Sequence, residues 1–115
     1  MKIVHFTEID PVEFPEPAKG VKGRVLVGKK DGAENFCMRL FELPPGAATP
    51  RHSHAWEHEI FIHAGFGEIY REGEWVPVRA GAAAFIPGEE EHQLRCSGET
   101  PLFFVCLIPD GPPEL

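Results

Sequence analysis

Turn-forming residues divide this chain into short segments, and that division limits the possible folds more than any other feature of the sequence. Glycine and proline occur 12 times each among 115 residues and recur at short intervals. The segments between them are rich in strand-forming residues, and none shows an apolar repeat at helical spacing. Strands that recur about every 8–12 residues between such turns are typical of a sandwich or a barrel. The sequence therefore predicts an all-β fold, with strands over residues 25–27, 36–43, 58–63, 68–71, 75–78, 82–86, 92–96 and 102–108.

The length of the chain predicts a single domain. A chain of 115 residues buries roughly two-thirds of its unfolded surface, which is enough for one hydrophobic core. We expect residues 1–115 to form one domain in which residues 23–109 make the barrel. Residues 1–22 contain Pro11, Pro15 and Pro17, and we expect them to form an N-terminal strand or extended arm.

The charge balance and the cysteines exclude several classes of protein. Lys and Arg number 11 against 18 Asp and Glu, a formal net charge of −7, which disfavours both nucleic acids and anionic membrane surfaces. The N-terminus has no signal-peptide pattern, and the apolar run 102–108 is too short to span a bilayer. Cys37, Cys96 and Cys106 are odd in number and lack CxxC spacing. We expect reduced thiols in a cytoplasmic protein.

Histidines gather in one part of the chain, where four of the six fall between residues 52 and 63. His52 and His54 are two residues apart, so on a strand both imidazoles point to one face. Glu59 from the following strand and His92 from a later one would complete a mixed nitrogen and oxygen site. Such a ligand set suits a divalent transition metal, and an octahedral metal would keep two adjacent positions open.

The spacing of these residues resembles that of the cupin family. The first and second cupin motifs are matched by Gly46-x5-His52-x-His54-x4-Glu59 with Gly65 or Gly67, and by Gly81-x5-Pro87 with His92. The second motif departs from the family at Glu89, where glycine is usual, and at Cys96, where asparagine is usual. The resemblance implies a jelly-roll β-barrel. It also implies that His52, His54, Glu59 and His92 bind one metal ion, with manganese, iron, nickel, zinc and copper as the candidates.

The direction of the side chains on strand 58–63 is left open by the sequence itself. Adjacent residues of a strand face opposite sides, so only one of His58 and Glu59 can reach the metal. Both His58-Ile60-Ile62 and Glu59-Phe61-His63 are plausible inward sets. The family motif favours Glu59, which leaves His63 at the barrel rim and His5 on the surface.

The sequence suggests a ligand pocket beside the metal. Arg39 shares parity with Phe41 and Leu43, so it either points into the barrel and binds a substrate carboxylate or lies on a solvated face. Phe61 and Phe85, with Ile86 and Phe104, are expected to line an apolar pocket. We therefore expect a metal-dependent enzyme of the oxygenase, decarboxylase or isomerase type that acts on a small oxygenated or carboxylated molecule. The alternative is a non-catalytic module that binds a metal or a small ligand.

The segment 102–108 bears on the oligomeric state. Its residues, Leu-Phe-Phe-Val-Cys-Leu-Ile, are apolar on both faces of the strand. A single jelly roll covers only the inner face, and an uncovered apolar row on the outer face is unusual for a monomer. We therefore expect a homodimer, or an assembly of dimers.

Overall fold

The computed structural model describes residues 1–115 and is almost entirely β-structure. It contains two 3-10 helices, η1 and η2, and nine strands, β1 to β9. Their bounds are η1 Phe6–Glu8, β1 Val12–Glu13, β2 Lys22–Val27, η2 Lys29–Asp31, β3 Phe36–Leu43, β4 His58–Ala64, β5 Phe66–Arg71, β6 Glu74–Arg79, β7 Ala83–Ile86, β8 Gln93–Cys96 and β9 Leu102–Pro109. No helix is long and apolar enough to cross a membrane.

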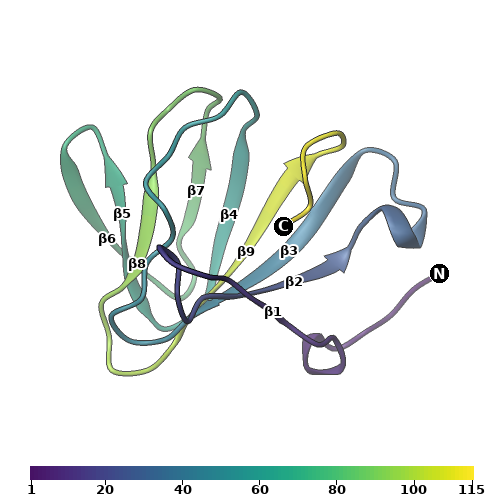
Figure 1. The fold of residues 1–115 in the computed structure, drawn as a ribbon, viewed down its shortest axis with the longest axis horizontal. Coiled ribbons are helices and arrows are strands. Elements are labelled where there is room, and N and C mark those ends of the chain that lie inside the picture. Colours follow the sequence, from purple (N-terminus) through teal and green to yellow (C-terminus); the bar gives the residue numbers. More distant parts are fainter.

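The strands form two antiparallel sheets. The large sheet has the order β1-β2-β3-β9-β4-β7, and the small sheet has the order β6-β5-β8. In Figure 1 the small sheet lies on the left, and the large sheet extends from the centre to the right. The core cluster draws on both, with Leu43, Ile62 and Leu102 from the large sheet and Ile69 and Leu94 from the small one. This arrangement confirms the predicted all-β jelly-roll fold.

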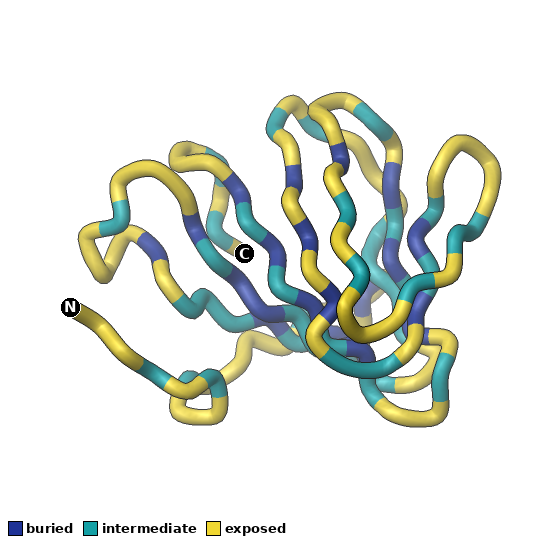
Figure 2. The backbone as a smooth tube through the Cα atoms, turned by 180° about the vertical axis from the view of Figure 1, so that it is seen from behind, coloured by how far each residue is buried: buried dark blue, intermediate teal, exposed yellow.

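Burial alternates along the central strands, as expected for a sheet with one face on the core. On β9, Leu102, Phe104, Cys106 and Ile108 are buried, whereas the residues between them are partly exposed. The same two-residue alternation runs along β4, as the colours of Figure 2 show. The outer face of the large sheet nevertheless carries apolar side chains, among them Val105 and Leu107.

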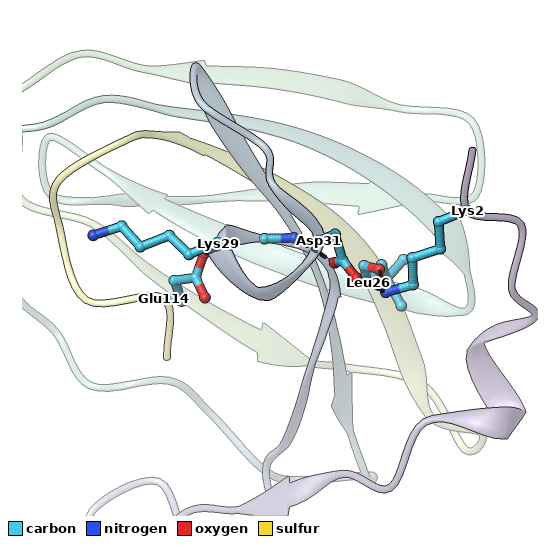
Figure 3. A network of polar contacts seen from close by, with 6 residues as sticks. Lys2, Leu26, Lys29, Asp31 and Glu114 are labelled. Atoms are coloured by element: carbon cyan, nitrogen blue, oxygen red, sulfur yellow. Dashed lines mark hydrogen bonds and ion pairs between the residues drawn. The ribbon is translucent and has the colours of Figure 1, made fainter.

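Both ends of the chain are bound near η2 (Figure 3). Lys2 Nζ donates to the Leu26 carbonyl at 2.8 Å and forms an ion pair with Asp31 at 2.9 Å. From the other end, the Glu114 carboxylate accepts a hydrogen bond from the Lys29 amide at 2.9 Å. The C-terminal segment is thereby held against the large sheet, where it forms part of the cavity wall described below.

Candidate metal centre and cavity

His52 and His92 are brought together by the backbone. The two residues form an isolated antiparallel bridge, in which the His52 amide donates to the His92 carbonyl at 3.1 Å and the His92 amide donates to the His52 carbonyl at 2.9 Å. Their imidazole rings lie 4.8 Å apart between centroids. Two segments that are distant in the sequence thus present neighbouring histidines at fixed spacing.

His54 completes a group of three. Its ring lies 5.1 Å from that of His52 and 4.9 Å from that of His92. The indole of Trp56 stacks on it, with 4.1 Å between centroids and nearly parallel planes. One nitrogen from each of the three rings lies within 4.8 Å of the others. These three histidines are close enough to bind one metal ion.

The hydrogen bonds of these histidines favour metal binding. Nδ1 of His54 lies 2.8 Å from the Trp56 carbonyl, and Nδ1 of His92 lies 2.9 Å from the Glu90 carbonyl. A carbonyl only accepts, so both rings carry their proton on Nδ1 and leave Nε2 unprotonated, with its lone pair able to bind a metal. Nε2 of His92 is buried and has no hydrogen-bond partner. Histidines that bind metals are typically fixed in this way by a partner of the other ring nitrogen.

The inward position on β4 belongs to His58, and the expectation that Glu59 points inward is wrong. His58 is buried, and its Nε2 lies 2.8 Å from Nε2 of His54. Glu59 is exposed on the outer face of the sheet. The reason is that His58 shares its face with Ile60 and Ile62, both of which are buried in the core. The shared parity of His58 with two isoleucines was the one sequence signal for the inward face, although Phe61 gives the opposite parity an apolar residue as well.

Burial favours the neutral form of three of these histidines. It is the main cause that lowers the pKa of His52, of His92 and of His58, whose pKa falls to about 3. The positive charge of Arg39 is the second cause at His58, while the Glu90 carbonyl opposes the shift at His92. Because neutral imidazole is the form that binds metals, these shifts keep the rings ready to do so at neutral pH.

A cavity of about 250 Å³ adjoins the histidines. Its polar lining comes from the four histidines, Arg39, Cys106 and Thr49, and the remaining wall is apolar. Phe14, Phe41 and Phe104 contribute aromatic surface, and Pro113 and Leu115 of the C-terminal segment also line it. No carboxylate side chain lines the cavity.

Arg39 faces this cavity and does not lie on a solvated face of the barrel. Its side chain is buried on β3, and its Nη2 lies 3.3 Å from Nδ1 of His58 and 2.9 Å from Sγ of Cys106. Nη1 donates to the Glu114 carbonyl at 3.4 Å. Burial raises the pKa of the Cys106 thiol, although Arg39 acts in the opposite direction.

Phe61 and Phe85 do not line the cavity, contrary to expectation. They lie on the outer face of the large sheet, 50% and 61% exposed, and line a groove there with Val105 and Leu107. The cause is again the alternation on β4, where Phe61 has the parity of Glu59, and Phe85 pairs with Glu59 from β7. His63 is exposed beside Phe6 and Phe103, and His5 is also exposed.

Comparison with known proteins agrees with this geometry. The family profile described as a cupin domain matches residues 39–108. An oxalate-binding protein of Thermotoga maritima is 34% identical over 113 residues, which cover 92% of each chain. The polyketide cyclase RemF from Streptomyces resistomycificus superposes with a TM-score of 0.90 and 34% identity, over 98% of this chain and 82% of that one. A predicted oxalate decarboxylase from Thermotoga maritima gives a TM-score of 0.81 and 30% identity, over 94% and 98% of the two chains.

Proposed function

This chain belongs to the cupin family, and from that premise we propose that it binds one divalent transition metal ion through His52, His54 and His92, with His58 as the fourth ligand. The observation that carries the proposal is the convergence of these imidazoles, two of which have Nδ1 hydrogen-bonded to a carbonyl and therefore an unprotonated Nε2. An all-imidazole set suits zinc, copper, iron or nickel better than manganese, which prefers oxygen ligands.

We propose further that the cavity receives a small oxygenated or carboxylated molecule. A bound metal would supply Lewis-acid or redox chemistry to an oxygen of that molecule. The histidines would orient the site, while the apolar wall would exclude bulk water from it. The relation to an oxalate-binding protein and to a polyketide cyclase supports an oxygen-bearing ligand.

The absence of a carboxylate from the cavity wall gives weight to the second candidate, a non-catalytic binding module. Some decarboxylases deliver a proton to their product from a carboxylic acid side chain. The cavity offers no such side chain, because the only titratable side chains in its lining are the histidines, Arg39 and Cys106. An enzyme of this site would therefore rely on the metal and on histidine. A binding module would need neither proton transfer nor turnover.

Metal analysis tests the first part of the proposal. The protein is produced without a histidine tag, stripped with a chelator and titrated with Zn²⁺, Ni²⁺, Cu²⁺, Fe²⁺ and Mn²⁺. We expect about one ion per chain and loss of binding in His54→Ala. The matched control is His63→Ala, an exposed histidine outside the cluster. Binding well below one ion per chain, or an unaffected His54→Ala, would contradict the proposal.

Two further features complete the proposed function. Cys37, Cys96 and Cys106 are all buried free thiols, which fits a protein that works in the reducing cytoplasm. The apolar groove on the outer face of the large sheet fits an isologous contact in a homodimer.

A further inference from the structure

Arg39 is a buried cation without an anionic counterpart. Its side chain is 7% exposed, and it takes part in none of the ion pairs of the chain. Its Nε is buried and has no hydrogen-bond partner. Buried charges in proteins are normally paired, because an isolated one is costly to remove from water. This arginine therefore calls for an anion that the protein itself does not supply.

The neighbours of Arg39 leave that role unfilled. They are a ring nitrogen of His58, the sulfur of Cys106 and the backbone carbonyl of Glu114, and none is a carboxylate. The side-chain carboxylate of Glu114, on the adjoining segment, accepts instead from the Lys29 amide at 2.9 Å. The contact to the Glu114 carbonyl is long, at 3.4 Å, so a stronger acceptor could replace it.

The wall beside Arg39 is aromatic. Its guanidinium lies 4.9 Å from the centroid of Phe41, which stacks on Phe104 at 5.3 Å and lies 6.2 Å from Phe14. A cavity of roughly 150 Å³ with apolar walls is able to hold benzene. At about 250 Å³, this cavity has room for one ring and an attached acid group.

We propose that Arg39 binds the carboxylate of an organic acid whose flat, apolar body packs against Phe41 and Phe104. This inference deepens the proposed function, since it names the class of ligand for the cavity beside the histidines. A guanidinium binds a carboxylate through two parallel hydrogen bonds, and the aromatic wall favours a ring over a short dicarboxylate. Binding at Arg39 does not require a metal.

Trp56 provides a direct readout, because it lines the cavity and stacks on His54. The other tryptophan, Trp75, packs against Tyr70 and Arg95 away from the cavity. In a Trp75→Phe background, Trp56 fluorescence is followed while metal-free protein is titrated with benzoate, with its neutral analogue benzamide and with oxalate. We expect benzoate to bind at least about tenfold more tightly than benzamide, as one charge-assisted pair allows, and also more tightly than oxalate.

Variants of Arg39 decide whether the discrimination arises there. Arg39→Met should abolish the preference for benzoate over benzamide, and Arg39→Lys should retain part of it. Arg71→Met, which removes an exposed arginine at the end of β5, should leave the preference unchanged. Zinc titration of Arg39→Met is the control for folding, because unchanged zinc binding would show that the histidine cluster of this variant is still assembled.

Three outcomes would overturn the inference: no benzoate binding, equal binding of benzoate and benzamide, or an unchanged preference in Arg39→Met. Tighter binding of oxalate than of benzoate would contradict the claim that the ligand has a flat, apolar part. Failure of the metal proposal is separate, because it would appear as the absence of metal binding while metal-free protein still discriminates the two probes.

Discussion

The neighbours of His58 and a bound metal favour different tautomers of its ring. On one side Nδ1 faces Nη2 of Arg39, which can only donate, so that contact places the proton of the ring on Nε2. On the other side Nε2 lies 2.8 Å from the unprotonated Nε2 of His54 and donates to it. A metal bound by His58 needs the other tautomer, with Nδ1–H directed at Cys106, a weak acceptor 3.0 Å away. We therefore expect His58 to be a weaker ligand than His54 or His92.

Substitution on β4 tests this assignment. His58→Ala should reduce zinc affinity about 10- to 100-fold, less than the loss in His54→Ala, because His58 must change tautomer to bind the metal and is the weaker ligand. Glu59→Gln should leave the affinity within about twofold, since that side chain is exposed on the outer face. Competition titration with a coloured chelator measures both. If Glu59→Gln is the more damaging change, the outer face supplies a ligand and the assignment fails.

The lowered histidine pKa values predict that the metal-free protein loses stability in acid. In the unfolded chain His58 takes up a proton near its ordinary pKa of 6.5, whereas in the folded protein its pKa is lowered to about 3. In this window the unfolded state holds more protons, so the free energy of unfolding falls as pH falls, by at most about 1.4 kcal/mol per pH unit for each such histidine. The stability is fully present above pH 6.5.

Urea unfolding at several pH values between 7.5 and 4 measures this dependence. Carboxylates also contribute in acid, so the informative quantity is the difference between variants. His58→Ala should show a shallower decline than the wild type, and His63→Ala should match the wild type. Identical slopes in all three proteins would show that His58 is not held neutral by the fold.

At the scale of elements, the segment that carries His52 and His54 packs directly on the loop that precedes His92. The amide of Glu89 donates to the His54 carbonyl at 2.6 Å, next to the bridge between His52 and His92. Gly88 lies so close to the Ala55 carbonyl that an added Cβ would overlap that backbone oxygen. The positions of His54 and His92 therefore depend on each other through this close approach.

Gly88→Ala should disturb both ligands at once. The two loops must separate to admit the methyl group, and we expect a loss of about 1–3 kcal/mol in the free energy of unfolding together with weaker zinc binding. Gly98→Ala is the control, because its Cβ would meet only the side chain of Phe66. Thermal unfolding with and without zinc measures both effects. Equal behaviour of the two variants would show that the contact is not needed.

The strands were predictable because their boundaries are set by local chemistry. Segments 36–43, 58–63 and 102–108 agree with β3, β4 and β9 to within one residue. The β5–β6 hairpin turns at Glu72 and Gly73, both with positive φ, and glycine is favoured at such a position of a tight turn. The inward parity of β4 was not predictable with the same rules, because Phe61 makes the outer face apolar too. The errors at Glu59, Phe61 and Phe85 share this one cause, whereas His52, His54 and His92 were brought together as expected.

On the scale of the whole molecule, the outer face of the large sheet carries an apolar surface that the chain leaves uncovered. Phe61 and Phe85 are exposed there and adjoin Val105 and Leu107. The N-terminal arm covers only part of this face, where Phe6 packs 5.8 Å from Phe103. Exposed apolar groups of this kind commonly mark contact sites between proteins.

We predict that this face forms a homodimer interface. Light scattering at micromolar concentration should give about twice the chain mass of 12.8 kDa. Phe61→Glu should give the monomer mass, because the contact would then bury a charge. Phe66→Glu, at a phenylalanine with 57% exposure on the small sheet, should remain dimeric. A wild-type mass near 12.8 kDa would refute the prediction.

The place of β9 in the large sheet has a consequence for how the chain reaches this structure. β9 is the last strand in the sequence, yet it lies between β3 and β4 and pairs with both. During synthesis, β3 and β4 therefore have no partner on these edges until residues 102–109 have left the ribosome. Unpaired edges with apolar side chains invite association between chains, and pairing over such distances is slow. Cys106 and Phe104 also belong to β9 and line the cavity, so ligand binding at this site reports that the last of these strands has docked.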